Sequence, residues 1–128
     1  MEKNNDNDIL IEARKVVSEL IRKVLVGELS VQKALTLFPS EPKDKSIDAA
    51  FHALVHYEAD EDLRKRDFLY KEEQDDYLTL LFQTLETGSQ LPKNIILNYE
   101  KYYKTADIPK PDNFKSNLLR FWRFLTLK

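Results

Sequence analysis

Apolar residues recur along most of this chain at intervals of three or four, the spacing that places side chains on one face of an α-helix. The first such stripe predicts a helix from about residue 8 to residue 26. Its members are Leu10, Ala13, Val17, Leu20, Ile21 and Val24. Asn7 or Asp8 can cap its start, and Gly27 suits its end because glycine adopts the left-handed cap conformation without strain. The polar residues 1–7 are expected to form a disordered tail.

A short second helix is expected from residue 31 to about residue 38, with Ser30 as its N-cap and Pro39 as its stop. Together with the preceding glycine turn it has the outline of a helix-turn-helix. Lys33 is the only charged residue of this short helix, whereas phosphate contacts need several cations. We therefore do not expect the hairpin to bind DNA.

The stretch 46–88 is expected to organise the fold, because it is the longest run without Pro or internal Gly. Ser46 is predicted to cap a helix whose buried face consists of Ile47, Ala50, Phe51, Leu54 and Val55. Asp60 is predicted to cap the next helix, which either continues to Thr87 or bends near Asp67. Its apolar stripe consists of Leu63, Tyr70, Tyr77, Leu78, Leu81 and Leu85.

In the last quarter of the chain, the pattern predicts a helix that starts near Pro92, an extended segment 105–113, and a C-terminal amphipathic helix. The apolar face of this last helix consists of Phe114, Leu118, Phe121, Trp122 and Leu125. Soluble monomers rarely expose a contiguous apolar patch of that kind, so its own bundle, a second copy or a partner must cover it. Aromatic residues and Arg are enriched in binding hot spots. The interaction surface that we expect is formed by Phe121, Trp122, Phe124, Arg120 and Arg123.

These patterns predict an all-α, single-domain bundle of five to six helices with an amphipathic C-terminal helix. The expected organisation is a disordered tail 1–7, a helical bundle 8–105, and a segment 106–128 that combines an extended linker with the C-terminal helix. A length of 128 residues suits one domain. The low Gly content, two residues, and the abundance of Leu, Glu and Lys favour helices.

Composition excludes several classes of protein. Without Cys there is no disulfide framework and no thiolate metal site. The pI of about 5.7 argues against a general nucleic-acid binder. No signal peptide and no apolar run of about 18 residues is visible, so we expect a cytoplasmic protein without a transmembrane segment.

Charge is distributed unevenly between the two ends of the chain. Residues 1–100 contain 13 Lys/Arg and 20 Asp/Glu, whereas residues 101–128 contain 7 Lys/Arg and 2 Asp/Glu. A basic C-terminal arm can lie on its own acidic body, or it can reach for an acidic partner. The sequence leaves both arrangements open.

One candidate for chemistry is the series Asp48, His52, His56 and Asp60, in which each residue follows the last by four. Two imidazoles at that spacing can share a metal ion, as in HExxH zinc helices. Here the segment reads HALVH, so the glutamate that acts as general base in those helices is missing. On a helical wheel both histidines point away from the buried face. We therefore expect a solvated helix face and assign no metal site.

A second candidate is the carboxylate group Glu58, Glu61, Glu72 and Asp75. Paired acidic segments on neighbouring helices can hold Mg²⁺ against a triphosphate, and this spacing is similar to that of the all-α nucleotide pyrophosphatases. The likeness covers fewer than about 20 residues and concerns spacing alone. Glu72 and Asp75 fall opposite the apolar stripe of their helix, which favours a solvated acidic face over a cleft.

No Gly-rich phosphate loop and no nucleophile elbow accompanies these groups. The function that we predict is that of a small non-catalytic helical protein, an adaptor, inhibitor or regulator, which binds another protein or forms a homodimer. This function needs no cofactor. The alternative prediction is a divalent-metal-dependent nucleotide phosphohydrolase that uses Mg²⁺.

Overall fold

The computed structural model describes residues 2–106, and within them the side chains of residues 7–101. The described chain contains six helices and no strand. They are α1 Glu2–Leu25, α2 Val31–Thr36, α3 Lys45–Ala59, α4 Glu61–Arg66, α5 Phe68–Glu86 and α6 Lys93–Ala106. The prediction of an all-α, single-domain bundle is confirmed. The expected C-terminal helix lies outside the described residues.

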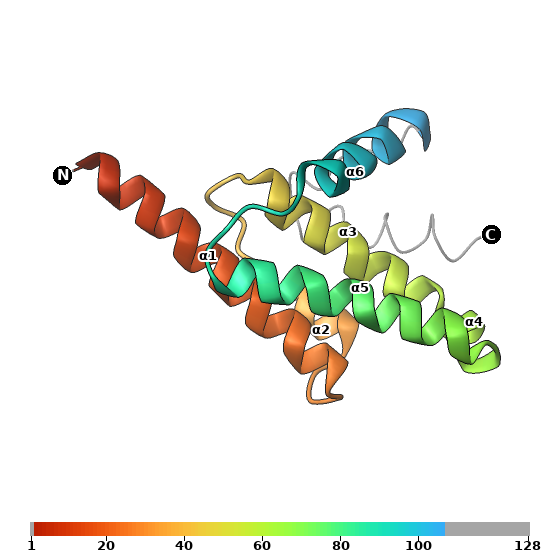
Figure 1. The fold of residues 1–128 in the computed structure, drawn as a ribbon. Coiled ribbons are helices and arrows are strands. Elements are labelled where there is room, and N and C mark those ends of the chain that lie inside the picture. The colour runs from red at the N-terminus through yellow and green to blue at the C-terminus, as the bar shows by residue number, and fades with distance from the viewer. Residues whose placement is uncertain (1, 107–128) are drawn as a thin grey trace.

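Helix α3 is the hub of the bundle, because it contacts each of the other five helices. The most extensive contact joins α1 and α5, which lie against each other on one side of α3, while α6 packs on α3 at the other side (Figure 1). α1 and α5 run antiparallel. Arg14 and Ser18 of α1 donate hydrogen bonds to the carbonyls of Gly88 and Phe82, so the earlier α1 residue pairs with the later residue of the other segment.

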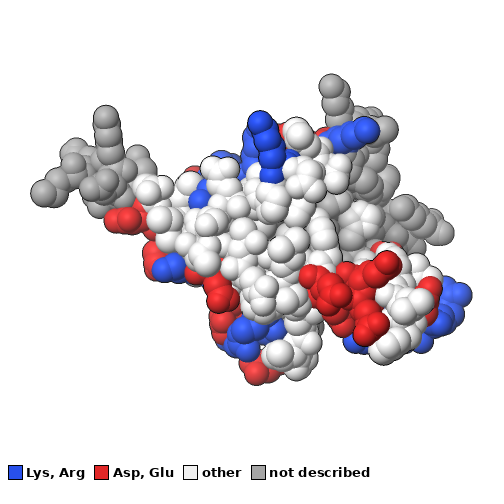
Figure 2. Space-filling view, viewed as in Figure 1, with Lys and Arg blue, Asp and Glu red and all other residues white. Residues whose placement is uncertain are grey.

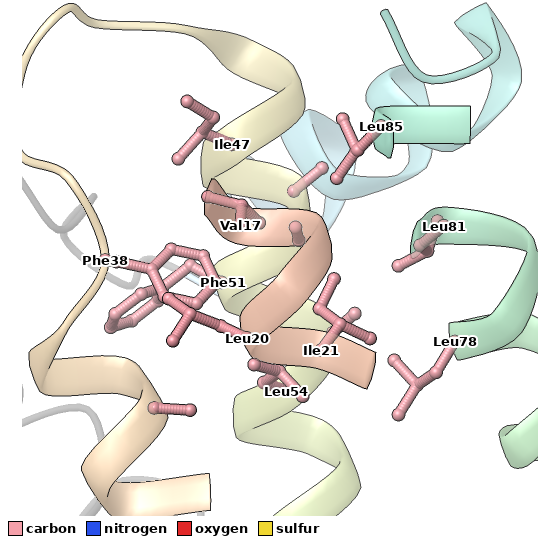
Figure 3. Packing of buried hydrophobic residues seen from close by; sticks show 14 of the residues in the cluster. Val17, Leu20, Ile21, Phe38, Ile47, Phe51, Leu54, Leu78, Leu81 and Leu85 are labelled. Carbon is pink, nitrogen blue, oxygen red and sulfur yellow. The ribbon is translucent and has the colours of Figure 1, made fainter. Parts of the chain in front are cut away.

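The core draws side chains from α1, α2, α3, α5 and α6 (Figure 3). Among the described residues, the fully buried apolar side chains include Val17, Ile21, Leu35, Phe51, Leu54, Leu78, Leu81 and Leu85. Phe38, just after α2, meets Phe51 of α3 edge-to-face with ring centroids 5.4 Å apart. The buried face predicted for α3 is therefore correct, as is the second half of the stripe on α5.

Two N-terminal boundaries differ from the sequence analysis. α1 begins at Glu2 rather than near residue 8, since no Pro or Gly interrupts the polar start and acidic residues there suit the helix dipole. α3 is capped by Asp44, whose carboxylate accepts the Ile47 N–H at 3.3 Å. The predicted cap, Ser46, is buried and instead accepts the Leu91 N–H at 2.9 Å.

The segment between Asp60 and Thr87 is bent rather than continuous. Asp67 leaves the helical conformation at φ −131° and ψ 102°, and its carboxylate accepts the Tyr70 N–H at 3.1 Å as the N-cap of α5. Asp60 takes the N-cap position of α4 without making a side-chain cap bond. Ser30 caps α2 as predicted, and Gly27 and Gly88 adopt the positive φ expected of helix ends.

None of the helices in residues 2–106 combines the length and the apolar character needed to cross a membrane.

Candidate functional site

The bend at Asp67 creates an exposed corner between α4 and α5. We use the name α4–α5 corner for the residues Leu63, Arg64, Lys65, Arg66, Phe68, Leu69 and Lys71. Phe68 and Leu69 are 68% and 71% exposed, the highest values for large apolar side chains in the described chain, and Leu63 is 39% exposed. α4 contributes no residue to the core. The corner thus displays apolar side chains that the described bundle leaves in water.

A polar network fixes the corner to the body of the bundle. The Asp60 carboxylate, at the end of α3, accepts hydrogen bonds from the Tyr70 hydroxyl at 2.6 Å and from Gln74 Nε2 at 3.2 Å. Gln74 Nε2 lies 3.2 Å from the Tyr70 oxygen as well. The hydrogen bond to Asp60 holds the proton on Tyr70 and raises its pKa to about 12. This network explains why Asp60 does not cap α4 with its side chain.

Arg64 links the same network to α3. Its guanidinium carbon lies 3.5 Å from the centroid of the Tyr57 ring, a cation–π contact. It also donates hydrogen bonds to the Tyr57 carbonyl and, at 3.2 Å, to Gln74 Oε1. The Tyr57 hydroxyl donates in turn to Asp75 at 3.1 Å. Burial raises the pKa of Tyr57, so at neutral pH the phenol remains a donor.

A cavity of about 460 Å³ opens beside this stack. Its lining consists of Tyr57, Glu61, Arg64, Lys65, Arg66, Phe68 and Lys71. Four of these seven side chains are cations and one is an anion. The cavity therefore favours a negatively charged group at the edge of the exposed Phe68.

The four carboxylates of the alternative prediction make different contacts. Asp75 accepts from Tyr57 and pairs with Lys71 Nζ at 2.7 Å, while Glu61 lies 3.6 Å from Lys65 Nζ. Glu72 is exposed on the outer side of α5. Burial, and secondarily the charge of Glu61, raises the pKa of Glu58.

The two histidines lie in a second cavity, of about 270 Å³, between α3, α5 and α6. His52 and His56 meet edge-to-face with ring centroids 4.5 Å apart, and His52 meets the buried Tyr99 of α6 at 5.6 Å. Burial, and secondarily the charge of His56, lowers the pKa of His52 to about 3. The expectation of a solvated histidine face is wrong, because α6 covers the side of α3 that faces away from the main core.

Neither set of candidate ligands is gathered for a metal ion. Within the described residues, no three His, Asp or Glu side chains form a group that could hold one. Asp48, His52, His56 and Asp60 share a helix spacing, yet Asp60 is turned into the network with Tyr70 and Gln74.

Sequence reasoning missed the α4–α5 corner. The adjacent pair Phe68 and Leu69 lies off the apolar stripe of α5, directly after the capping residue Asp67. This position could have revealed the corner from the sequence. Two large apolar residues that lie off the apolar stripe of a helix do not face the core and are therefore exposed. The predicted interaction surface around Trp122 lies outside the described residues.

In comparisons with protein-family models, curated proteins and solved structures, the chain matched none.

Proposed function

We propose that this protein is a non-catalytic adaptor, inhibitor or regulator that works by binding a protein, and that the α4–α5 corner is a contact surface. The observation that carries the proposal is the exposure of Phe68 and Leu69, at 68% and 71%. Covering apolar side chains of that size lowers the free energy of the complex, and aromatic residues are enriched in interfaces. A cytoplasmic location stays part of this proposal.

The hydrogen bonds that hold the corner in place also favour it as a contact surface. The corner is held by the hydrogen bonds of Asp60, Tyr70, Gln74 and Arg64 rather than by core packing. A surface that is already fixed in place loses little conformational entropy when it binds. The predicted surface around Trp122 is a second contact surface in this proposal and rests on the sequence alone.

The proposal is tested with the double variant Phe68→Ser, Leu69→Ser. Both residues stand in the first turn of α5, where Ser is tolerated, and both are exposed, so the variant should keep its helix content and its stability to within about 0.5 kcal/mol. The control is Val26→Ser, Leu37→Ser, which removes two exposed apolar side chains at the ends of α1 and α2.

The measurement is chemical crosslinking in the cells that make the protein, followed by titration calorimetry with each purified partner. We expect the corner variant to weaken binding at least about tenfold, the effect of losing a hot-spot side chain, while the control binds normally. A corner variant that keeps every contact of the unaltered protein at unchanged affinity would contradict the assignment of the corner.

A further inference from the structure

The charges of the α4–α5 corner are separated on two sides of Phe68. Lys71 and Glu72 follow Phe68 by three and four residues, so they flank the line that runs along α5 from Phe68. On the Lys71 side lies the cationic cavity with Arg64, Lys65 and Arg66. Figure 2 shows the opposite side, where acidic side chains gather over the first half of α5, with uncharged surface between them and the basic tip at α4.

The acidic side is formed by Glu72, Glu73 and Asp76. All three are exposed, and none forms an ion pair with another residue of the described chain. Glu72 and Asp76 are four residues apart and therefore neighbours on one helix face, where like charges repel. A cation placed against them would relieve that repulsion.

The basic side also carries positive charge that is not neutralised by nearby carboxylates. Lys71 is paired with Asp75, and Lys65 lies 3.6 Å from Glu61. Arg64 and Arg66 have no carboxylate within ion-pair distance in the described part of the chain, and the described hydrogen bond of Arg66 runs at 3.4 Å to the Asp62 carbonyl. Arg66 is exposed, whereas Arg64 is half-buried against Tyr57 and Gln74, so this edge of Phe68 carries positive charge that no carboxylate of the described chain neutralises.

We propose that the α4–α5 corner binds the same corner of a second copy of this chain, about a two-fold axis that passes close to Phe68. A two-fold interface brings one patch against itself, so groups on opposite sides of the axis meet each other's counterparts. The basic side of each copy then faces the acidic side of the other in two equivalent contacts, and Phe68, Leu69 and Leu63 of both copies are covered between them. This inference rests on the proposed function and names the partner.

Other occupants fit the charge pattern less well. An anionic membrane or a nucleic acid that approaches the cationic cavity would also meet the three carboxylates next to it, and like charges there oppose binding. A uniformly acidic protein partner meets the same repulsion. A second copy satisfies both sides at once, because its own surface carries the complementary arrangement.

The association should be weak and sensitive to salt. The apolar centre is small, so the interface belongs to the low end of specific contacts, with a Kd on the order of 100 µM. Its polar contacts lie at the rim, where salt screens them. Raising ionic strength should therefore favour the monomer.

Charge reversal tests the geometry directly. The basic-side variant is Lys65→Glu, Arg66→Glu, and the acidic-side variant is Glu72→Lys, Asp76→Lys. Each variant alone places like charges on both sides of Phe68, so each should associate at least about tenfold more weakly, which corresponds to about 1.4 kcal/mol. An equimolar mixture should regain association, because acidic sides then meet basic sides in both contacts of the mixed pair.

The measurement is sedimentation equilibrium of the full chain from about 10 µM to about 1 mM, a range that brackets the expected Kd. The matched control is Lys15→Glu, Lys33→Glu, two exposed cations on α1 and α2, which should associate as the unaltered protein does. Circular dichroism verifies that each variant is folded.

Two results would overturn the proposal. One is an unaltered protein that remains monomeric at about 1 mM, far above the expected Kd. The other is a mixture of the two charge variants that stays monomeric while the unaltered protein dimerises. If self-association fails but the Phe68→Ser, Leu69→Ser variant still loses a different protein, the proposed function stands. If that variant loses nothing, the proposed function fails as well.

Discussion

At the scale of single residues, Arg14 shows how a charge is kept inside this bundle. Its guanidinium donates from Nε and Nη2 to the two oxygens of Asp44, both at 3.0 Å, and from Nη1 to the Gly88 carbonyl at 2.9 Å. Asp44 is at the same time the N-cap of α3. One buried side chain therefore joins α1 to the start of α3 and to the end of α5.

We predict that Arg14→Met lowers the free energy of unfolding by about 3–5 kcal/mol, because Asp44 keeps its charge in a buried site without its partner. The same substitution at Arg22, which is exposed and pairs with Glu19 at 2.6 Å, should leave the free energy of unfolding almost unchanged, because solvent screens the pair. Urea denaturation at neutral pH measures both. Equal losses at the two positions would contradict the role assigned to burial.

His52 makes stability depend on pH. Burial lowers its pKa from the usual 6.5 to about 3 in the folded protein, so between these pH values the unfolded chain binds a proton that the folded chain does not bind. The free energy of unfolding therefore has its full value, as far as His52 is concerned, above about pH 6.5. It falls as the pH is lowered, by up to about 1.4 kcal/mol per pH unit. Among the described residues, the polar side chains that line the same cavity as His52 are His56 on its own helix, Gln74 and Tyr77 on α5, and Asn98 and Tyr99 on α6.

We predict that His52→Asn flattens this dependence, since an amide does not titrate. Urea denaturation at several pH values between about 7.5 and 4.5 measures it for both proteins, and the difference in slope isolates His52 from the carboxylates. Parallel curves for the two proteins would contradict the lowered pKa, because they would mean that His52 binds protons equally in the folded and the unfolded chain.

At the scale of elements, the end of α5 is packed directly against α1. Gly88 has φ +82°, and a Cβ atom built on it would lie 2.6 Å from Cγ2 of Ile11. The Ile11 side chain is branched at Cβ and has little freedom to move aside. Gly27 has nearly the same φ, +80°, but open space around it.

The two glycines form a matched pair for mutation. Gly27→Ala should cost about 1 kcal/mol, the strain of an L-residue in the left-handed region. Gly88→Ala should cost about 2–4 kcal/mol, because overpacking against Ile11 adds to the same strain. Thermal unfolding measures the loss of stability in each variant. A larger loss for Gly27→Ala than for Gly88→Ala would contradict the prediction.

Much of the element pattern was predictable because it depends on local signals. The buried face of α3, the cap at Ser30 and the stop at Gly27 follow from spacing and cap chemistry within a few residues. Contacts between distant segments were not predictable in the same way. Nothing near Arg14 indicates that its partner is Asp44, and nothing near His52 indicates that Tyr99 of α6 lies against it.

The proposed contact surface was harder to predict for the same reason. The position of Phe68 relative to the cationic cavity depends on the bend at Asp67, which the sequence left as one of two alternatives. Once Asp67 caps α5, Lys71 and Glu72 take opposite sides of Phe68, and the charge pattern of the corner follows. The proposal therefore adds the α4–α5 corner to the contact surface that the sequence predicts around Trp122.

At the scale of the whole molecule, the C-terminal segment 107–128 stays a prediction from the sequence. If its apolar face packs on this chain, Trp122→Ala should cost about 3–5 kcal/mol through lost contacts and a cavity. Deleting residues 112–128 provides the wider test, measured by thermal unfolding and sedimentation. A truncated protein that is equally stable and monomeric would mean that the segment is a free arm.

Stability should also be distributed unevenly over the bundle, and amide hydrogen exchange can map it. The amides of α1, α3 and the second half of α5 surround the fully buried side chains, so they should exchange only through global unfolding. α4 contributes no buried residue and is held by a polar network, so its amides should exchange much faster. If two corners associate, protection in α4 and the first turn of α5 should rise with protein concentration while protection in α1 does not change. Exchange in α4 as slow as in α3 at the lowest protein concentration would contradict the view that polar contacts, rather than core packing, hold the corner.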